Sequence, residues 1–385
     1  MKGLALEVIV VRLPAWLLGA MLLCGVAVAQ GPQQQGRQDT GNPGLAHTRL
    51  VVLGAGAGRT AMRGGGEGGM SAAVQVGRDV YLVDFGAGWL DAFYQAGLAT
   101  PGPTDIPGGL ETLRAGFITH LHADHMADYG RLVQFGPTDG LQKRKTPVAV
   151  YGPGRVTDSG LFPGIKDRKT LMQPDNPAPG IVDVTESLLQ ANAADINDNM
   201  SDGGRPSPRV YLAAHDIIIP ENAGASLSKP SPRMAPFEIY KDENVRVLAT
   251  LVNHAPIYPA FAFRFETPNG IIVFSGDTNR NDNLINMARG ADVLVHEAMD
   301  MNWPRKFLPE PRSSSDEAKL RHLLEAHTDV AELGSIASEA GVKVLVLSHL
   351  GPPTTSDADY LAQIKGFAGK VFVGRRLFSL GLPIR

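Results

Sequence analysis

The chain of 385 residues contains a single cysteine, Cys24. One thiol excludes an internal disulfide and any zinc site built from several cysteines. Aromatic residues make up only 6% of the sequence, charged residues 19%, and the formal net charge is −3. Because the chain has no excess of basic residues, its composition does not indicate a nucleic-acid-binding surface.

The composition that remains is that of an ordinary globular protein. Hydrophobic residues make up 43% of the chain, which argues against wholesale disorder. The length allows either two domains or one large α/β domain that carries an insert.

The first residues have the pattern of an export signal. A positively charged start precedes an apolar run over residues 13–28, and Ala27 and Ala29 provide the small residues of a cleavage site. We therefore expect residues 1–29 to be a signal peptide, residues 30–48 to be a Gln/Gly/Pro-rich linker, and the protein to be periplasmic or secreted. After removal of the signal we expect no stable membrane insertion. A retained N-terminal membrane anchor is the alternative, because the segment is nearly long enough to span a bilayer.

Short apolar strand patterns alternate with helical patterns over the rest of the chain, which predicts a mixed α/β architecture. Strands are expected at residues 49–53, 80–86, 115–119, 148–151, 245–252, 261–266, 271–275, 293–296, 342–348 and 370–373. Helices are expected at residues 90–96, 126–135, 184–193, 284–290, 315–327 and 330–340. Residues 155–240 are rich in Pro, Asn and Asp, and we interpret them as an insert that covers the site rather than as a second core.

The strongest motif is H-x-H-x-D-H, formed by His120, His122, Asp124 and His125 between an apolar strand pattern and a helical pattern. Alternate residues of an extended backbone point to the same side, so His120 and His122 project together. The turn that follows brings Asp124 and His125 to a second position nearby. Imidazole nitrogen and carboxylate oxygen both suit Zn²⁺, so the motif predicts a metal site. A polar loop with coincidental histidines is the alternative.

Further candidate ligands stand where apolar strand patterns end. His254, Asp277 and His349 each follow such a run, and His296-Glu297 ends another. Because α/β proteins build sites at the ends of their strands, we expect the first three residues to join the metal motif. Taken singly, each would be an ordinary surface or capping residue.

Together these motifs resemble the metallo-β-lactamase fold hydrolases, in that family's order along the chain. The resemblance runs from about residue 49 to the C-terminus. It implies an α/β fold, an αββα sandwich with a dinuclear metal site at one edge and an insert that covers the site.

The resemblance also implies a role for each ligand. One zinc ion would be held by His120, His122 and His254. The other would be held by Asp124, His125 and His349, with Asp277 as the bridge between them. Asp84, at the end of a Leu-Val-Asp-Phe-Gly strand, would support the metal loop.

Within that family the chain resembles the ribonuclease Z and arylsulfatase-type branch. The match rests on Leu53-Gly54-Ala55-Gly56, on His296-Glu297-Ala298 and on His327-Thr328. It implies that His327 assists catalysis by protonating the leaving oxygen, with Glu297 orienting an imidazole. With Asp124, these are the candidate catalytic residues. A helix C-terminal role for His327 and an exposed position for Glu297 are the alternatives.

The expected function is an exported dinuclear zinc hydrolase that cleaves a sulfate or phosphate ester, because two cations can share a water and lower its pKa. The Leu-Gly-Pro-Pro stretch after His349 is more similar to the arylsulfatase-type group. We therefore expect a small anionic ester as substrate, nucleic acid as an unlikely partner, and a homodimer as one option. A ribonuclease Z-like phosphodiesterase or a non-catalytic metal-binding protein is the alternative, and Mn²⁺ or Fe is an alternative metal.

Weaker signals remain open. The glycines over residues 54–58 favour a tight loop beside the metal edge, because no Lys-Ser/Thr follows as in a phosphate-binding loop. We expect a structural role for His215 and a solvated position for His47 and His322. Four aromatic residues near the ligands would line an aryl pocket or pack in the core: Tyr129, Tyr258, Phe261 and Trp303.

Overall fold

The computed structural model describes residues 47–58, 66–102, 108–158, 160–162 and 164–384. These residues belong to one compact unit of the chain. Both the expected signal peptide and nearly all of the expected linker lie outside the described residues. Within the described part, no helix combines the length and the apolar character needed to cross a bilayer.

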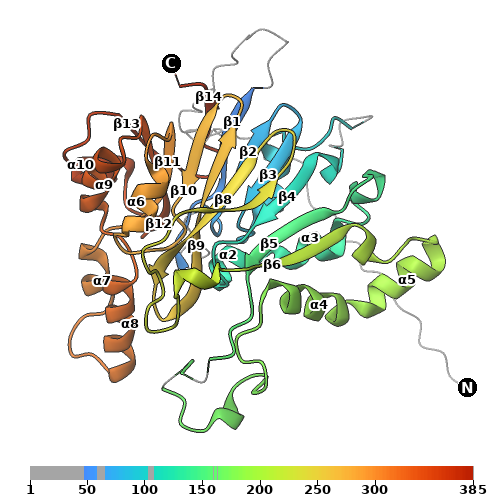
Figure 1. Cartoon of the computed structure of the whole chain (residues 1–385), viewed down its shortest axis with the longest axis horizontal. Coiled ribbons are helices and arrows are strands. Elements are labelled where there is room, and N and C mark those ends of the chain that lie inside the picture. The colour runs from blue at the N-terminus through green and yellow to red at the C-terminus, as the bar shows by residue number, and fades with distance from the viewer. Residues whose placement is uncertain (1–46, 59–65, 103–107, 159, 163, 385) are drawn as a thin grey trace, which may run out of the picture. The chain divides into compact units, whose positions relative to one another are not determined.

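Two seven-stranded sheets form the centre of the molecule (Figure 1). In order across the first sheet, the strands are β14 (Ser379–Leu382), β1 (Thr48–Gly54), β2 (Ser71–Val76), β3 (Asp79–Val83), β4 (Leu113–Phe117), β5 (Val148–Pro153) and β6 (Leu212–Ile217). Across the second sheet they are β13 (Lys370–Val373), β12 (Val344–Gly351), β11 (Val293–Met299), β10 (Gly270–Phe274), β9 (Ile257–Thr267), β8 (Arg246–His254) and β7 (Phe237–Lys241). Both sheets are mixed: β3 to β6 run parallel, as do β10 to β13.

Helices cover the outer faces of both sheets. The described α-helices are α1 (Trp89–Gln95), α2 (Ala123–Met126), α3 (Tyr129–Phe135), α4 (Ile181–Ala191), α5 (Ala193–Gly203), α6 (Asp282–Ala288), α7 (Asn302–Phe307), α8 (Ser314–Glu325), α9 (Leu333–Ala340) and α10 (Asp357–Gln363). Residues of α1, α3 and α4 pack on the first sheet, and residues of α6 and α9 pack on the second. The fold is therefore the αββα sandwich that the sequence predicts.

Alternate side chains of β9 point to opposite faces of the second sheet and so pack in two different layers. Phe261, Phe263 and Phe265 point into the core between the sheets, whereas Ala260 and Ala262 face the helical layer of the second sheet. Large aromatic side chains fill the space between the sheets, and small ones allow the helices to approach closely.

The stretch 155–240, expected as an insert that covers the site, contributes elements of the sandwich itself, and none of its described residues lines the cavity at the metal ligands. It contributes α4, whose Ile181 and Leu189 are buried in the core of the first sheet, and it supplies β6 and β7. These two strands lie at the edges of the two sheets, where one side lacks a neighbour. β7 was not expected from the sequence, because its residues are half-buried or exposed and form no continuous apolar run.

The helix predicted over residues 126–135 is interrupted in the structure between residues 126 and 129. The short helix α2 ends at Met126, and α3 begins at Tyr129.

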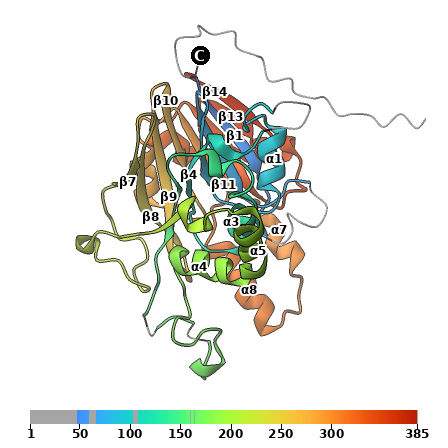
Figure 2. The same ribbon diagram turned by 90° about the vertical axis from the view of Figure 1, so that its right-hand side faces the viewer.

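Figures 1 and 2 both show α4 and the segment formed by α7 and α8 toward the same end of the two sheets.

Candidate metal centre

The histidine-rich motif spans the loop after β4, which carries His120 and His122, and α2, which carries Asp124 and His125. His120 and His125 are fully buried, whereas His122 and Asp124 are half-buried. His122 has an extended backbone directly before α2, so it projects away from the helix that carries His125. One short segment thereby presents ligands from both an extended and a helical backbone.

The remaining predicted ligands come from three strands of the second sheet. His254 is the last residue of β8, Asp277 follows β10, and His349 lies near the end of β12. Gly276 has a φ of 59°, and a Cβ at this position would lie 2.4 Å from the carbonyl oxygen of Phe261. Only glycine fits this turn, which directs Asp277 into the site. His349 itself has a φ of 44°, a strained backbone of the kind that concentrates at functional sites.

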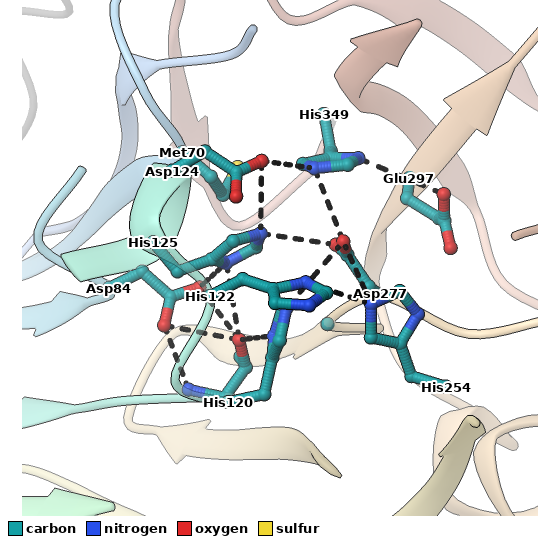
Figure 3. A network of polar contacts seen from close by, with 12 residues as sticks. Met70, Asp84, His120, His122, Asp124, His125, His254, Asp277, Glu297 and His349 are labelled. Atoms are coloured by element: carbon teal, nitrogen blue, oxygen red, sulfur yellow. Dashed lines mark hydrogen bonds and ion pairs between the residues drawn. The ribbon is translucent and has the colours of Figure 1, made fainter. Parts of the chain in front are cut away.

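The predicted ligands meet in two groups (Figure 3). Two further groups share some of them: His254 with His322 and His327, and Asp277 with His327 and His349. In each group, the potential ligand atoms lie within 4.8 Å of one another. The first group consists of His120, His122, His254 and Asp277, and the second of Asp124, His125 and His349. These are the two sets that the family resemblance implies, brought together from β4–α2, β8, β10 and β12.

The Asp277 carboxylate lies between the two groups. Its Oδ1 is 3.3 Å from His125 Nε2, and its Oδ2 is 3.2 Å from His349 Nε2. On the other side, Oδ2 is 3.8 Å from the Nε2 atoms of both His120 and His254. A single carboxylate is therefore within reach of both sets.

The donor set fits divalent metal ions. The buried atoms His120 Nε2, His125 Nε2, His349 Nδ1 and Asp277 Oδ1 have no hydrogen-bond partner among the described residues. Buried polar atoms are nearly always satisfied, and the ring nitrogens of His120 and His125 lie 3.8 and 3.3 Å from the Asp277 carboxylate, which is an arrangement of ligands suited to a cation. Imidazole and carboxylate ligands of this kind suit zinc and its neighbours.

Burial sets the charge of the first group. Loss of solvation lowers the pKa of His120 well below its usual value and lowers the pKa of His254 to about 3. It also lowers the pKa of His122 to about 4. These imidazoles are therefore neutral, which is the form that binds a metal.

In the second group, carboxylates offset the effect of burial on the histidine pKa. Burial alone would lower the pKa of His349, but Asp277 and Asp124 raise it to about 10. Burial would raise the pKa of Asp277, and His349 and His125 nevertheless hold it well below the usual range. Asp277 is thus an anion at the centre of the cluster.

Asp84 is hydrogen-bonded to the metal-binding motif. Its fully buried carboxylate accepts hydrogen bonds from Thr119 N at 2.8 Å and from Thr119 Oγ1 at 2.9 Å. His125 Nδ1 lies 2.8 Å from its Oδ2, which fixes the proton on Nδ1 and leaves Nε2 facing Asp277. Asp84 has a φ of 62°, a second strained residue at the site.

His327 and Glu297 form a buried pair beside the cluster. His327 Nδ1 lies 2.8 Å from Glu297 Oε2, and Glu297 Oε1 accepts a hydrogen bond from Thr278 N at 2.6 Å. Burial lowers the pKa of His327, but the carboxylate raises it above the usual value. His327 is not at the end of α8, which stops at Glu325, and Glu297 is not exposed. The alternatives of a helix C-terminal histidine and an exposed acid are thus wrong.

Asp124 is held by the glycine-rich loop. Its Oδ2 accepts a hydrogen bond from Gly58 N at 2.7 Å and lies 3.1 Å from His349 Nε2. The loop after β1 therefore supports the metal edge.

A cavity of about 700 Å³ opens beside the cluster. Its lining includes His122, Asp124, Asp277, His327 and His349. It also includes His322 of α8, which is half-buried, with its ring centroid 5.3 Å from that of His254. The expectation that His322 is solvated is wrong, because α8 packs with this side toward the site.

The other predicted residues lie apart from the cluster. Tyr129 is buried and hydrogen-bonded to Thr185, and Phe261 belongs to the core between the sheets. Tyr258 lines a separate cavity, so Trp303 is the one of the four aromatic residues that lines the cavity at the cluster. His215 is exposed and stacks on Tyr151 with a centroid distance of 4.9 Å.

Comparison with known proteins gives two kinds of relative, and no family model matches the chain. A ribonuclease Z of Mycobacterium bovis (strain BCG / Pasteur 1173P2) is 26% identical over 317 residues, covering 80% of this chain and 90% of the relative. A ribonuclease Z of Mycobacterium sp. (strain KMS) is 27% identical over 297 residues, covering 77% and 83%.

Two solved structures share the fold. The metallo-beta-lactamase fold protein YhfI from Bacillus subtilis has a TM-score of 0.52 and 20% identity, covering 87% of this chain and 99% of that one. The short form of human tRNase Z has a TM-score of 0.52 and 17% identity, covering 87% and 100%.

These relatives correct one expectation. A small anionic ester as substrate, with nucleic acid as an unlikely partner, is contradicted by sequence relatives that are ribonucleases Z. The low content of basic residues was a poor guide, because a net charge says nothing about the local surface around a site. The sequence relatives, the sandwich and the cluster agree: the chain is a metal-dependent hydrolase with the metallo-β-lactamase fold, and its sequence is similar to ribonucleases Z.

Proposed function

We propose that this protein is a ribonuclease Z-like phosphodiesterase that cleaves RNA with the help of two zinc ions. The observation that carries the proposal is the position of Asp277, whose carboxylate reaches both groups of ligands. The ribonuclease Z relatives favour a phosphodiester over the sulfate ester that the C-terminal sequence suggested.

The two groups would hold one ion each. His120, His122 and His254 would bind the first, and Asp124, His125 and His349 the second, with Asp277 between them. When bound, a pair of such ions lowers the pKa of a shared water and neutralises charge on phosphoryl oxygens. Asp84 would keep His125 in the tautomer that offers Nε2.

His327 is the group that we assign to the leaving oxygen. Its Nδ1 donates to Glu297 Oε2, so its Nε2 is free to carry the proton that a departing ribose oxygen needs. His327 lines the cavity together with Asp124, so both are accessible to a substrate. Glu297 holds the imidazole in place through a hydrogen bond at each oxygen: one from His327 and one from Thr278 N.

The test combines metal content with a substrate panel. The purified protein should bind two equivalents of zinc and cleave bis-p-nitrophenyl phosphate and single-stranded RNA, but not p-nitrophenyl sulfate or nitrocefin. His120→Ala or Asp277→Ala should abolish turnover. His215→Ala is the matched control, because that histidine is exposed and lies on β6 away from the cluster.

Two outcomes would contradict the proposal. Sulfate cleavage without diester cleavage would restore the arylsulfatase-like function. Two bound zinc ions with no turnover on any of these substrates would support the non-catalytic metal-binding protein.

Export is a separate proposal. The signal-like pattern of residues 1–29 predicts that the mature protein begins near Gln30, in the periplasm or outside the cell. Determining the N-terminus of the protein from fractionated cells tests this, and an intact Met1 in a cytoplasmic fraction would refute it.

A further inference from the structure

One wall of the cavity at the metal cluster is formed by α7 and α8. From α7 it receives Trp303 and Phe307, and from α8 it receives Lys319, His322 and Leu323. The same cavity is lined by the ligands Asp124 and Asp277. A molecule that reaches the cluster therefore lies against this wall.

The two aromatic rings on α7 are stacked. Trp303 and Phe307 are four residues apart, which places them on one side of the helix. Their ring centroids are 4.8 Å apart with an interplanar angle of 23°. Phe307 is nevertheless 43% exposed, and Trp303 is half-buried. Large aromatic rings held in a stack at the surface of a cavity are typical of binding sites.

The positively charged side chain of Lys319 lies beside this aromatic pair. Lys319 Nζ lies 4.6 Å from the centroid of the Phe307 ring, and it forms no ion pair with any residue that the structure describes. Arg312 of the same segment behaves differently, because it is paired with Glu310 at 3.0 Å. Lys319 is thus a cation available to an anionic ligand beside a stacked aromatic surface.

We propose that Trp303, backed by Phe307, stacks with a base of the RNA next to the bond that is cut, while Lys319 contacts a neighbouring phosphate. This inference rests on the proposed function and names the part of the substrate that the wall recognises. Proteins that bind single-stranded nucleic acid combine aromatic platforms for the bases with cations along the backbone. Because every base has a π-face, the wall recognises an unpaired nucleotide and gives little preference among sequences.

Binding is measured first, with the zinc-loaded full-length protein. The probe is a short fluorescein-labelled single-stranded RNA with phosphorothioate linkages, followed by fluorescence anisotropy. Trp303→Ala and Trp303→Leu should weaken binding roughly 5- to 100-fold, whereas Trp303→Phe should restore it to near the wild-type value. Phe135→Ala is the control, because Phe135 is an exposed aromatic side chain on α3, outside this cavity.

The charge is tested in the same assay. Lys319→Ala should weaken binding and reduce its dependence on salt. Lys306→Ala is the matched control, because Lys306 is exposed on α7 and does not line the cavity. In kinetic measurements, Trp303→Ala should raise KM for RNA with kcat nearly unchanged, since the stack binds the substrate and takes no part in the chemistry.

An RNA series with one abasic site at successive positions locates the stacked base. One position next to the cut should lose most of the binding, and the loss should vanish in Trp303→Ala. Equal binding by wild type and Trp303→Ala, or an effect of Trp303→Ala on bis-p-nitrophenyl phosphate but not on RNA, would overturn the inference. Stack-dependent binding without any cleavage would support the inference and refute the proposed function, so the two failures are distinguishable.

Discussion

Replacing Asp84 by asparagine removes one negative charge from beneath the metal loop and keeps the size of the side chain. The carboxylate accepts hydrogen bonds from Thr119 N, Thr119 Oγ1 and His125 Nδ1, at 2.8, 2.9 and 2.8 Å. An amide can keep the bond from Thr119 N with its oxygen. Its NH₂ group then faces the Nδ1–H of His125, so two donors meet and one buried polar group is left unpaired.

The magnitude follows from these contacts. Loss of a group that orients a metal-bound histidine typically lowers metal affinity about 10- to 100-fold. The unpaired donor costs about 1–3 kcal/mol in the free energy of unfolding. We expect Asp84→Asn to fold, to bind zinc about 10- to 100-fold more weakly, and to lose turnover at limiting zinc.

The assay is competition for zinc with a chromophoric chelator, with urea denaturation of the metal-free proteins alongside. Asp79→Asn is the control: Asp79 begins β3, the strand that Asp84 follows, and its carboxylate contacts Arg114 at 2.7 Å and Asn244 Nδ2 at 2.6 Å, both outside the metal loop. Exposed ion pairs of this kind contribute about 0–1 kcal/mol, so zinc affinity should not change in the control. If Asp84→Asn bound zinc as tightly as the wild type, the assigned role of Asp84 in orienting His125 would be refuted.

The other predictions concern the catalytic pair, the metal and the core. Glu297→Gln should lower kcat about 10- to 100-fold because His327 loses the carboxylate that orients it, and an unchanged kcat in steady-state kinetics would argue against this role. Removal of zinc with a chelator should lower the thermal midpoint in calorimetry, because an ion that binds only the folded state stabilises that state; an unchanged midpoint would show that the cluster holds no structural metal. Phe265→Ala should cost about 3–5 kcal/mol in urea denaturation, since Phe265 is fully buried between the sheets, and a loss below about 1 kcal/mol would contradict that packing.

Much of the candidate site could be read from the sequence because its ligands fall at recognisable points of local structure. His120, His122, Asp124 and His125 lie within one short segment, where the order of extended and helical backbone decides how they project. Asp277 ends an apolar strand at a glycine. Most strands were also predicted, since buried strands of a sandwich are continuous apolar runs.

Other features depended on contacts between distant segments. β7 is an edge strand without a continuous apolar run, and it was found only as the neighbour of β8. His322 lies on a largely polar helix, α8, and only the packing of that helix against the site turns the imidazole toward His254. The same packing separates Trp303, which lines the cavity, from Tyr129 and Phe261, which are core residues.

The sequence by itself determined which side chains can bind metal, because imidazole and carboxylate groups in a tight motif have few other uses. It also determined a mixed α/β architecture, through the alternation of apolar strands and helical patterns, whereas the sandwich followed from the family resemblance. Only the tertiary structure decided that Asp277 reaches both groups of ligands and that α7 and α8 form a wall of the cavity. Distances between residues far apart in the chain are set by how the sheets and helices pack, and local patterns do not contain them.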